Sequence, residues 1–466
     1  MRSRPTPDQL CEAASVRLTG LDTAFLCLDR DVSPMHLGAL TIFRPEGLSD
    51  PARVAAVLAQ RAERISQLRL RVQPSRFPFL AGTWADDPAF CAKDHIQVHC
   101  LDRPWDLDGV AALAAELIIR PLPRSRPLWE LHVIAGTGWD RFGVLFKLHH
   151  AFGDGMGALE IGLQMLDEVT LGGRGFWRRG EVANGTSPVT ESSTLSRLWQ
   201  SHDDVRGVVE GVLGQVSDAT SIAASVLRSA RLPAPASPLL ISSSGRRALA
   251  VAALKLQQVR QIRARYGGTV NDVLLSVVTG ALREWLRARS GSIDGLTLRA
   301  FIPVSQRARS GERIGGNRLS GYLCALPVGE PDPGERLLMI RRSMERNRAA
   351  GASGGAGAIP VLADRLPAAV HRIAAPVAGQ CASLLFDLMV TSIPVPSIRF
   401  TLDGAELEAV FPIAPLAADQ ALVIGLSWYQ NRAYVVLNAD RDGLPDVYRL
   451  AEAIQPAMEA LTSLVE

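Results

Sequence analysis

Residues 143–166, GVLFKLHHAFGDGMGALEIGLQML, are the stretch that decides the fold of this chain. Gly143 to Leu148 is an apolar run of strand length, and Met156 to Val169 has apolar residues at helical spacing. The residues between them, His149-His150-Ala151-Phe152-Gly153-Asp154-Gly155, therefore form a loop that joins a strand to a helix. Such loops commonly display catalytic side chains, so this loop is the first candidate for a functional site.

Strand and helix patterns alternate on both sides of this stretch. The first half predicts strands at Met35–Phe43 and Leu131–Ala135 and helices at Pro51–Ile65 and Val110–Ile119. The second half predicts helices at Ala253–Tyr266, Val270–Ala288 and Val447–Leu464, the last kinked at Pro456, and strands at Leu298–Pro303, Tyr322–Val328, Ala421–Trp428 and Ala433–Asn438. The alternation predicts a mixed α/β, or α+β, architecture.

The length of 466 residues exceeds the size at which one hydrophobic core stops growing, which predicts two domains. We place an N-terminal domain at residues 1–171, an interdomain connection at 172–247 and a C-terminal domain at 248–466. Within the connection, Leu195–Leu227 has apolar residues at mostly helical spacing. It predicts one amphipathic helix or two shorter ones, either packed on the domains or bound to a membrane surface.

The charge balance and the cysteines limit the possible classes of function. Fifty Lys and Arg residues against 47 Asp and Glu leave a formal charge of +3, too small for ordinary nucleic-acid binding. The six cysteines are scattered and form no metal-binding pattern, which predicts a cytoplasmic protein without a metal. Residues 1–10 lack the apolar core of a secretion signal, and the apolar runs are too short to span a bilayer. Membrane contact is therefore expected to be peripheral.

His150 is the candidate general base of the loop. An imidazole has an unperturbed pKa of about 6.5, so near neutral pH it can accept the proton of an alcohol. The pattern HHxxxDG fixes four positions, which makes a chance match improbable. His149 is either functional or structural, and Asp154 is expected to hold the loop through an ion pair with an arginine. Gly155 is expected to permit a positive φ and the close approach of a ligand.

These residues also permit interpretations other than general-base chemistry. The histidine pair could be structural, ending a strand with backbone hydrogen bonds. Gly153 to Ala158 fits the GxGxxA pattern of dinucleotide sites, but no second strand ending in the required acidic residue follows. The sequence has no GxxxxGK[ST] loop or HExxH pattern, so P-loop and zinc chemistry lack their usual support.

A weak internal sequence repeat connects the two halves. Ala433–Asn438 followed by ADRDG resembles Gly143–His150 followed by AFGDG. If the halves arose by duplication, Asn438 stands in the second copy where His150 stands in the first, which leaves one active centre. Chance similarity between two short strand ends is the alternative.

Several stretches besides HHxxxDG carry a family resemblance. They are Leu21-Asp22-Thr23-Ala24-Phe25-Leu26, Met35-His36-Leu37-Gly38, Pro127-Leu128-Trp129-Glu130, Asn271-Asp272, Gly316-Asn317-Arg318, Phe411-Pro412-Ile413 and Ala439-Asp440-Arg441-Asp442. With them the chain resembles the bacterial wax ester synthase/diacylglycerol acyltransferase family over nearly its whole length. The motif itself is shared with other CoA-dependent acyltransferases, including chloramphenicol acetyltransferase and nonribosomal peptide condensation domains. The segment 391–396, TSIPVP, departs from the family's SNVPGP-like turn, because Val395 replaces a glycine.

The resemblance implies two chloramphenicol-acetyltransferase-like domains with mixed sheets and a tunnel at their interface, with His150 near its middle. Pro127, Leu128, Trp129, Asn271 and Asp272 would support or line this tunnel as candidate substrate-binding residues. Trp129 could equally be core packing, and the Asn-Asp pair could cap a helix.

The resemblance also implies an acyl-CoA-dependent O-acyltransferase that forms triacylglycerol or wax esters from diacylglycerol or a long-chain alcohol. Long-chain acyl-CoA would be a co-substrate, with no cofactor, and the enzyme would contact a membrane or lipid-droplet surface peripherally. The alternatives are a condensation-type enzyme acting on a polyketide or glycolipid hydroxyl, and a noncatalytic lipid-binding protein of the same fold.

Overall fold

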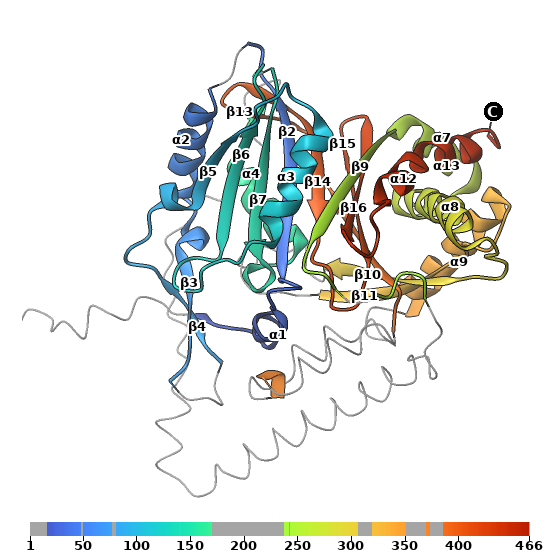
Figure 1. Ribbon diagram of the computed structural model, residues 1–466, viewed down its shortest axis with the longest axis horizontal. Coiled ribbons are helices and arrows are strands. Elements are labelled where there is room, and N and C mark those ends of the chain that lie inside the picture. The colour runs from blue at the N-terminus through green and yellow to red at the C-terminus, as the bar shows by residue number, and fades with distance from the viewer. Residues whose placement is uncertain are drawn as a thin grey trace, which may run out of the picture.

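The computed structural model describes residues 16–47, 50–76, 81–138, 140–169, 237–241, 243–305, 319–350, 370–372 and 385–465. In these ranges the chain forms two lobes that lie side by side, each built on a mixed β-sheet (Figure 1). The predicted mixed α/β class and the prediction of two domains are thereby confirmed.

The first lobe is built on a seven-stranded sheet. Its strands, in spatial order, are β5 (Ile96–Cys100), β6 (Trp129–Ala135), β7 (Phe142–His149), β2 (His36–Arg44), β14 (Ala405–Ile413), β13 (Arg399–Leu402) and β8 (Asp167–Val169). Beside it lie the helices α1 (Gly20–Leu28), α2 (Pro51–Ala62), α3 (Leu107–Ile119) and α4 (Gly155–Gln164), the short helices η2 (Ser66–Arg69), η3 (Ala92–His95) and η4 (His150–Phe152), and a small sheet of β1 (Val16–Arg17), β4 (Thr83–Asp86) and β3 (Leu70–Gln73). The two strands predicted before the histidines correspond to β6 and β7, which pair antiparallel.

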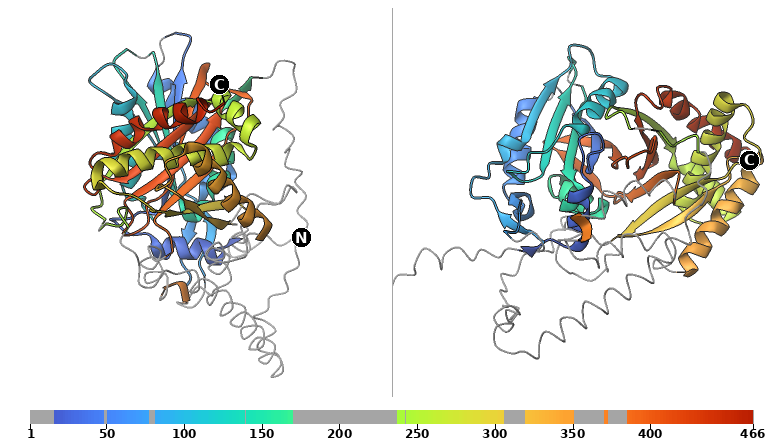
Figure 2. Two further views of the ribbon diagram at one scale, coloured as in Figure 1. Left: turned by 90° about the vertical axis from the view of Figure 1, so that its right-hand side faces the viewer. Right: turned by 60° about the horizontal axis from the view of Figure 1, so that its bottom comes forward.

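The second lobe is built on a six-stranded sheet. Its strands, in spatial order, are β11 (Leu319–Leu326), β10 (Leu298–Ser305), β12 (Leu388–Pro394), β15 (Leu422–Tyr429), β16 (Arg432–Asp440) and β9 (Arg247–Lys255). Its helices are α7 (Leu256–Tyr266), α8 (Val270–Ser290), α9 (Pro333–Ala350), α12 (Val447–Glu452) and α13 (Ile454–Thr462). Figure 2 shows that α8 and α9 cover the side of this sheet turned away from the first lobe. Among the helices of the described ranges, none combines the length and apolar character needed to cross a bilayer.

Among the predicted helices whose bounds differ in the structure, three show a physical reason for the difference. The helix expected at Met156–Val169 ends at Gln164, because Asp167–Val169 pairs with β13 as an edge strand. The helix expected from Ala253 begins at Leu256, because the alanine-rich residues before it belong to β9 and pair with β16. The C-terminal helix divides at Ala453, so Pro456 lies in the first turn of α13, where a missing backbone N–H breaks no helical bond.

The second half of the chain contributes two strands to the sheet of the first lobe. β13 and β14 come late in the sequence, yet β14 pairs with β2 and β13 pairs with β8 in the first sheet. The domain boundaries proposed at 171 and 247 stay predictions. The amphipathic helix predicted at Leu195–Leu227 and the stretch Gly316-Asn317-Arg318 lie outside the described residues.

The central strands of the two lobes repeat one arrangement. β5-β6-β7-β2 and β12-β15-β16-β9 each begin with a parallel pair and continue with two antiparallel pairs. In the first lobe His149 N–H donates to the Leu128 carbonyl and His150 N–H to the Met35 carbonyl; Asp440 and Arg441 make the matching bonds in the second.

This repeated strand arrangement supports the internal sequence repeat but corrects its alignment. The backbone bonds match His149 with Asp440 and His150 with Arg441, so the predicted match between His150 and Asn438 is wrong. The sequence comparison matches similar residue types, whereas the backbone pairing places the counterpart of His150 three residues further along, at Arg441. At the position of the candidate base, the second lobe thus carries an exposed arginine.

Candidate active site

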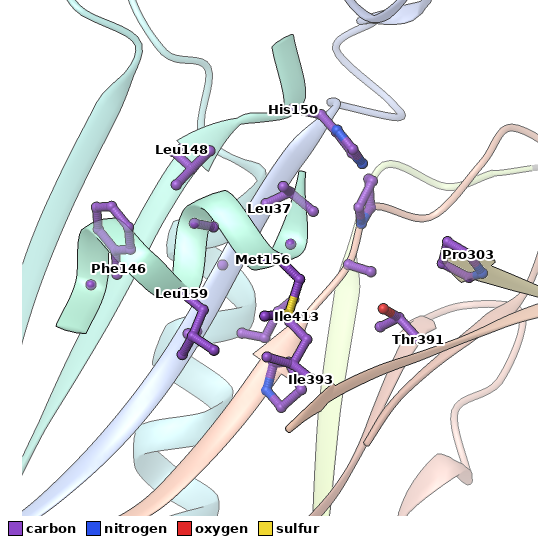
Figure 3. A pocket seen from close by; sticks show the side chains of 18 of the residues that line it. Leu37, Phe146, Leu148, His150, Met156, Leu159, Pro303, Thr391, Ile393 and Ile413 are labelled. Atoms are coloured by element: carbon purple, nitrogen blue, oxygen red, sulfur yellow. The ribbon is translucent and has the colours of Figure 1, made fainter. Parts of the chain in front are cut away.

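The ring of His150 lies at the end of a strand and faces a cavity. β7 ends at His149, and the chain turns through η4 before α4 begins. The backbone N–H of His150 donates to the Met35 carbonyl at 2.7 Å, and its ring stacks on Phe25 of α1 with ring centroids 3.8 Å apart. Figure 3 shows the ring pointing from the strand end into the cavity, across from Thr391 of β12.

The cavity lies between the two lobes and has a volume of about 530 Å³. This volume is within the range of roughly 300–1,000 Å³ that is usual for small-molecule sites. Its walls are mostly apolar and come from both halves of the chain. The polar side chains in the lining are Arg30, Ser33, Thr41, His150, Ser305, His371, Thr391 and Ser392. Such a cavity suits a long alkyl chain better than a polar substrate.

His149 is buried in the loop and holds its shape. Only 1% of the residue is exposed, and its Nδ1 accepts the backbone N–H of Ala151 at 3.0 Å. The ring proton must then be on Nε2, which lies 3.5 Å from a carboxylate oxygen of Asp29. His149 is not among the described residues that line the cavity, so its geometry favours the structural interpretation.

Asp29 is a site residue that the sequence analysis missed. Besides facing His149, its carboxylate accepts the backbone N–H of Met35 at 2.9 Å and a guanidinium N–H of Arg124 at 3.0 Å. Burial acts to raise its pKa, but the hydrogen bonds and the charges of these partners outweigh burial and hold the pKa well below its usual value. Because the Met35 carbonyl binds the backbone of His150, the Asp29 carboxylate supports both histidines.

Asp154 joins the loop to the second lobe. It is fully buried and caps α4, accepting the N–H of Gly157 at 2.9 Å through one oxygen. Its other oxygen accepts the hydroxyl of Ser305, in β10, at 2.9 Å. The predicted arginine partner of Asp154 stays a prediction, because residues 306–318, several of them arginines, lie outside the described part of the chain.

Gly155 has a different role from the one expected. Among the described residues, neither this glycine nor Gly153 is in the left-handed region, since Gly153 has an extended φ of 170° and Gly155 begins α4. The expectation of a positive φ is therefore wrong. What requires a small residue is close packing, because a Cβ at this position would lie 3.3 Å from Cδ1 of Ile393 in β12.

Pro127, Leu128 and Trp129 lie outside the described lining of the cavity. Trp129 is fully buried, donates its indole N–H to the Leu68 carbonyl at 2.8 Å and stacks on His95. The Leu128 carbonyl accepts the backbone N–H of His149 at 3.0 Å. None of the three is among the described lining residues, so their substrate contact stays a prediction.

Asn271 and Asp272 begin α8 in the second lobe, also outside the cavity lining. Asp272 closes a capping box with Thr269 and pairs with Arg348 at 3.3 Å. The side-chain carbonyl of Asn271 accepts the hydroxyl of Ser392, a lining residue, at 2.5 Å. The pair therefore caps a helix and supports one residue of the cavity wall, while direct substrate contact stays a prediction.

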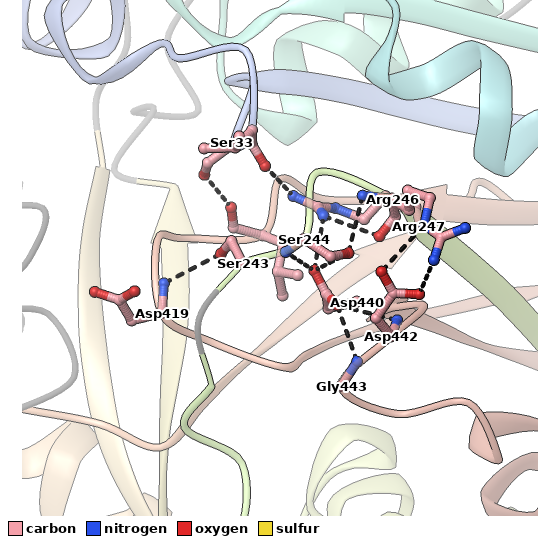
Figure 4. Close-up of polar contacts among 11 residues, drawn as sticks. Ser33, Ser243, Ser244, Arg246, Arg247, Asp419, Asp440, Asp442 and Gly443 are labelled. Atoms are coloured by element: carbon pink, nitrogen blue, oxygen red, sulfur yellow. Dashed lines mark hydrogen bonds and ion pairs between the residues drawn. The ribbon is translucent and has the colours of Figure 1, made fainter.

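A second-lobe cluster fixes the segment that precedes Met35 (Figure 4). The buried Arg247 donates to the Val32 carbonyl at 3.0 Å and lies 3.4 Å from the fully buried carboxylate of Asp440. Nearby, the Ser33 hydroxyl donates to the Leu416 carbonyl at 2.7 Å. These contacts tie the start of β2 to the second lobe and so help to place the Met35 carbonyl under His150.

His36 gives the fold a defined acid sensitivity. Burial, followed by the positive charge of Lys147, lowers the pKa of this imidazole from its ordinary value of 6.5 to about 4. Between these pH values the unfolded chain binds a proton at His36 that the folded chain does not. The stability that depends on neutral His36 is therefore fully present above pH 6.5 and is lost as the pH falls toward 4. The unfolding free energy is expected to drop from pH 7 to pH 5 by roughly 2 kcal/mol more in the wild type than in His36→Gln. Denaturant titration at both pH values measures this, and equal drops in the two proteins would contradict it.

Comparisons with known proteins agree with this architecture. Residues 18–274 match the family model described as the wax ester synthase/diacylglycerol acyltransferase catalytic domain, and residues 315–462 match the C-terminal domain of the same family. A Mycobacterium tuberculosis relative named probable diacylglycerol O-acyltransferase tgs1 is 29% identical over 459 residues, with 96% of each chain covered.

Two solved structures share the fold. The wax ester synthase/diacylglycerol acyltransferase from Marinobacter aquaeolei VT8 has a TM-score of 0.68 at 23% identity, covering 97% of this chain and 100% of that one. A starter condensation domain of rhizomide synthetase, solved with C8-CoA and Leu-SNAC, has a TM-score of 0.54 at 15% identity, covering 99% of this chain and 97% of that one.

Proposed function

The chain belongs to the wax ester synthase/diacylglycerol acyltransferase family, and we propose that His150 is the general base of its acyl transfer from a CoA thioester to a hydroxyl. The protein is an acyltransferase. The observation that carries the proposal is the position of the His150 ring, at the wall of an apolar cavity lined by both lobes. His149, in contrast, has both ring nitrogens directed at residues of the protein.

In this mechanism the His150 imidazole accepts the proton of the acceptor hydroxyl as its oxygen attacks the thioester carbonyl. The tetrahedral intermediate then collapses with cleavage of the carbon–sulfur bond. The imidazolium returns the proton to the leaving thiolate, so the products are an ester and CoA thiol. Asp29 and Asp154 act by holding the loop, since their carboxylates bind residues of the protein at every contact described above.

The substrates follow from the cavity and the family. An apolar cavity of this size binds alkyl chains by burying methylenes, each of which contributes about 0.8 kcal/mol. The acyl donor is a long-chain acyl-CoA, and the acceptor is diacylglycerol or a long-chain alcohol, giving triacylglycerol or wax esters. These substrates enter from a membrane or lipid-droplet surface that the protein contacts peripherally.

An acceptor assay tests this function. The purified protein is given hexadecanoyl-CoA with hexadecanol, with diacylglycerol or with no acceptor, and the release of CoA thiol is measured. We expect release to rise at least about tenfold with one or both acceptors, because the hydroxyl is the nucleophile. Release that is equally fast without an acceptor would indicate a thioesterase, and no release in any arm would indicate a noncatalytic lipid-binding protein. Either result would contradict the proposal.

A further inference from the structure

One arm of the cavity runs along the first sheet, away from His150. Side chains on a strand alternate between its faces, and Phe146 and Leu148 of β7 line the cavity while Lys147 does not. The Lys147 ammonium lies on the opposite face, where it donates to the Leu117 carbonyl of α3 at 3.1 Å. On β2, the cavity-lining residues paired with this face of β7 include Leu37 and Ala39. The arm therefore lies on the side of the sheet away from α3.

α4 forms the other wall of this arm. Met156, Leu159 and Gly162 line the cavity at intervals of three residues, and Leu163, four residues after Leu159, lines it too, so one stripe of the helix faces the sheet. Figure 3 shows Leu148, Phe146 and Leu159 along this side of the cavity.

α2 contributes to the wall at the far end of the arm. Leu58 of that helix is in the lining and is 2% exposed. The Arg61 guanidinium, one turn further along α2, donates to the Met165 carbonyl just after α4 at 2.5 Å. This bond ties the end of α4 to α2 at the far end of the arm.

The length of the arm can be counted in strand residues. The lining extends along β2 from Leu37 to Phe43, and the pair beside the catalytic loop is His36 with His149. Seven residues at about 3.3 Å each give roughly 23 Å from that pair to Phe43. Because a carbon–carbon bond of about 1.5 Å advances an extended alkyl chain by roughly 1.3 Å, the arm holds a chain of about sixteen to eighteen carbons.

The chemistry of the arm suits an alkyl chain. Among the described residues of β2, β7 and α4 that line it, Thr41 is the one with a polar side chain. Its hydroxyl donates to the Val144 carbonyl at 3.0 Å, so that hydrogen is already bound within the sheet. A hydroxyl or ester group pushed into this arm would lose its bonds to water, whereas methylenes gain from burial.

We propose that this arm, bounded by β2, β7 and α4, holds the acyl chain and that Gly162 sets how far the chain extends. This inference rests on the proposed function, because it takes His150 as the point where the thioester reacts. A Cβ at Gly162 would lie 3.9 Å from Cδ1 of Phe146, which is ordinary contact, so a larger side chain there would project into the arm.

The register gives the level of this constriction. Phe146 pairs with Ala39, three residues from the His36–His149 pair. Three residues at about 3.3 Å correspond to roughly 10 Å, or about eight carbons of an extended chain. A leucine at position 162 should therefore leave room for an octanoyl group and obstruct a hexadecanoyl group.

The test compares kcat/KM for octanoyl-CoA and hexadecanoyl-CoA with one alcohol acceptor. In Gly162→Leu, kcat/KM for hexadecanoyl-CoA is expected to fall at least about 100-fold, because several methylenes lose their burial, while the octanoyl-CoA value stays within about threefold. Gln164→Leu is the matched control, because it adds the same side chain at an exposed position of α4 and should leave the ratio unchanged. Ala39→Val narrows the arm from the opposite wall, at the same level, and carries the test if Gly162→Leu does not fold.

An unchanged ratio of the two kcat/KM values in a folded Gly162→Leu or Ala39→Val protein would overturn the acyl-arm proposal while leaving the role of His150 intact. Failure of the proposed function gives a different result, since the wild type itself would then transfer neither acyl group to the acceptor.

Discussion

Replacing His150 with alanine is expected to lower kcat/KM for acyl transfer by about 10² to 10⁴, the usual contribution of a general base. The physical reason is that the substitution removes the imidazole that faces the cavity at the end of β7, where the acceptor hydroxyl is proposed to react. An alcohol would then have to attack the thioester with its proton still attached. The rate of CoA thiol release, measured over a range of acyl-CoA concentrations at saturating acceptor, gives this kcat/KM.

Two further variants separate chemistry from folding. The His150 ring stacks on Phe25, so His150→Ala also removes a packing contact, and His150→Gln retains a planar side chain that cannot act as a base. His150→Ala and His150→Gln are expected to lose turnover to the same degree. His99→Ala, which removes a half-buried imidazole in β5, is the matched control and should keep normal turnover. If turnover of His150→Gln stayed within threefold of the wild type, with unchanged dependence on the acceptor, His150 would be ruled out as the general base.

Replacing Arg247 with methionine is expected to destabilise the protein by about 3 kcal/mol, at the lower end of the cost of breaking a buried ion pair. The side chains of Arg247 and Asp440 are 2% and 0% exposed, so the substitution leaves a buried carboxylate without its cation. The loss is not larger because Asp440 keeps the backbone N–H groups of Ser244 and Gly443, at 2.8 Å and 3.0 Å. The midpoint of denaturant unfolding, at an unchanged m-value, measures the loss.

The neighbouring residue provides the control. Arg246 pairs with Asp442, but both side chains are well exposed, at 62% and 44%. Arg246→Met is therefore expected to cost less than about 1 kcal/mol, because water screens the pair. If both methionine variants cost the same, the account of Arg247 as a buried clamp between the lobes would be wrong.

Local patterns predicted much of the fold. The strands that became β2, β6, β7, β10, β11, β15 and β16 were all expected, because each is an apolar run bounded by turn residues. β14 was not expected as a strand from its pattern, since Pro412 interrupts it and prolines are rare in central strands. It lies between β2 and β13 through long-range pairing, which no local pattern could indicate.

The site shows the same division. The prediction that the histidine pair lies at a strand end before a helix is confirmed, with His149 the last residue of β7 and His150 the first of η4, because the motif and its flanking patterns are contiguous. Asp29 lies 120 residues earlier than His149 and has no motif of its own, so its contact with the histidine appears only in the folded chain. The second lobe shows the same limit of local sequence. Similar residue types suggested Asn438 as the counterpart of His150, whereas backbone hydrogen bonds assign Arg441.

The most direct test of the account is a crystal structure of the protein with a non-hydrolysable thioester analogue of hexadecanoyl-CoA and with hexadecanol. The account predicts the alcohol oxygen within about 3.2 Å of a ring nitrogen of His150 and next to the carbonyl carbon of the analogue. If the alcohol oxygen and the carbonyl met elsewhere in the cavity, beyond the reach of that ring, the central claim would be contradicted.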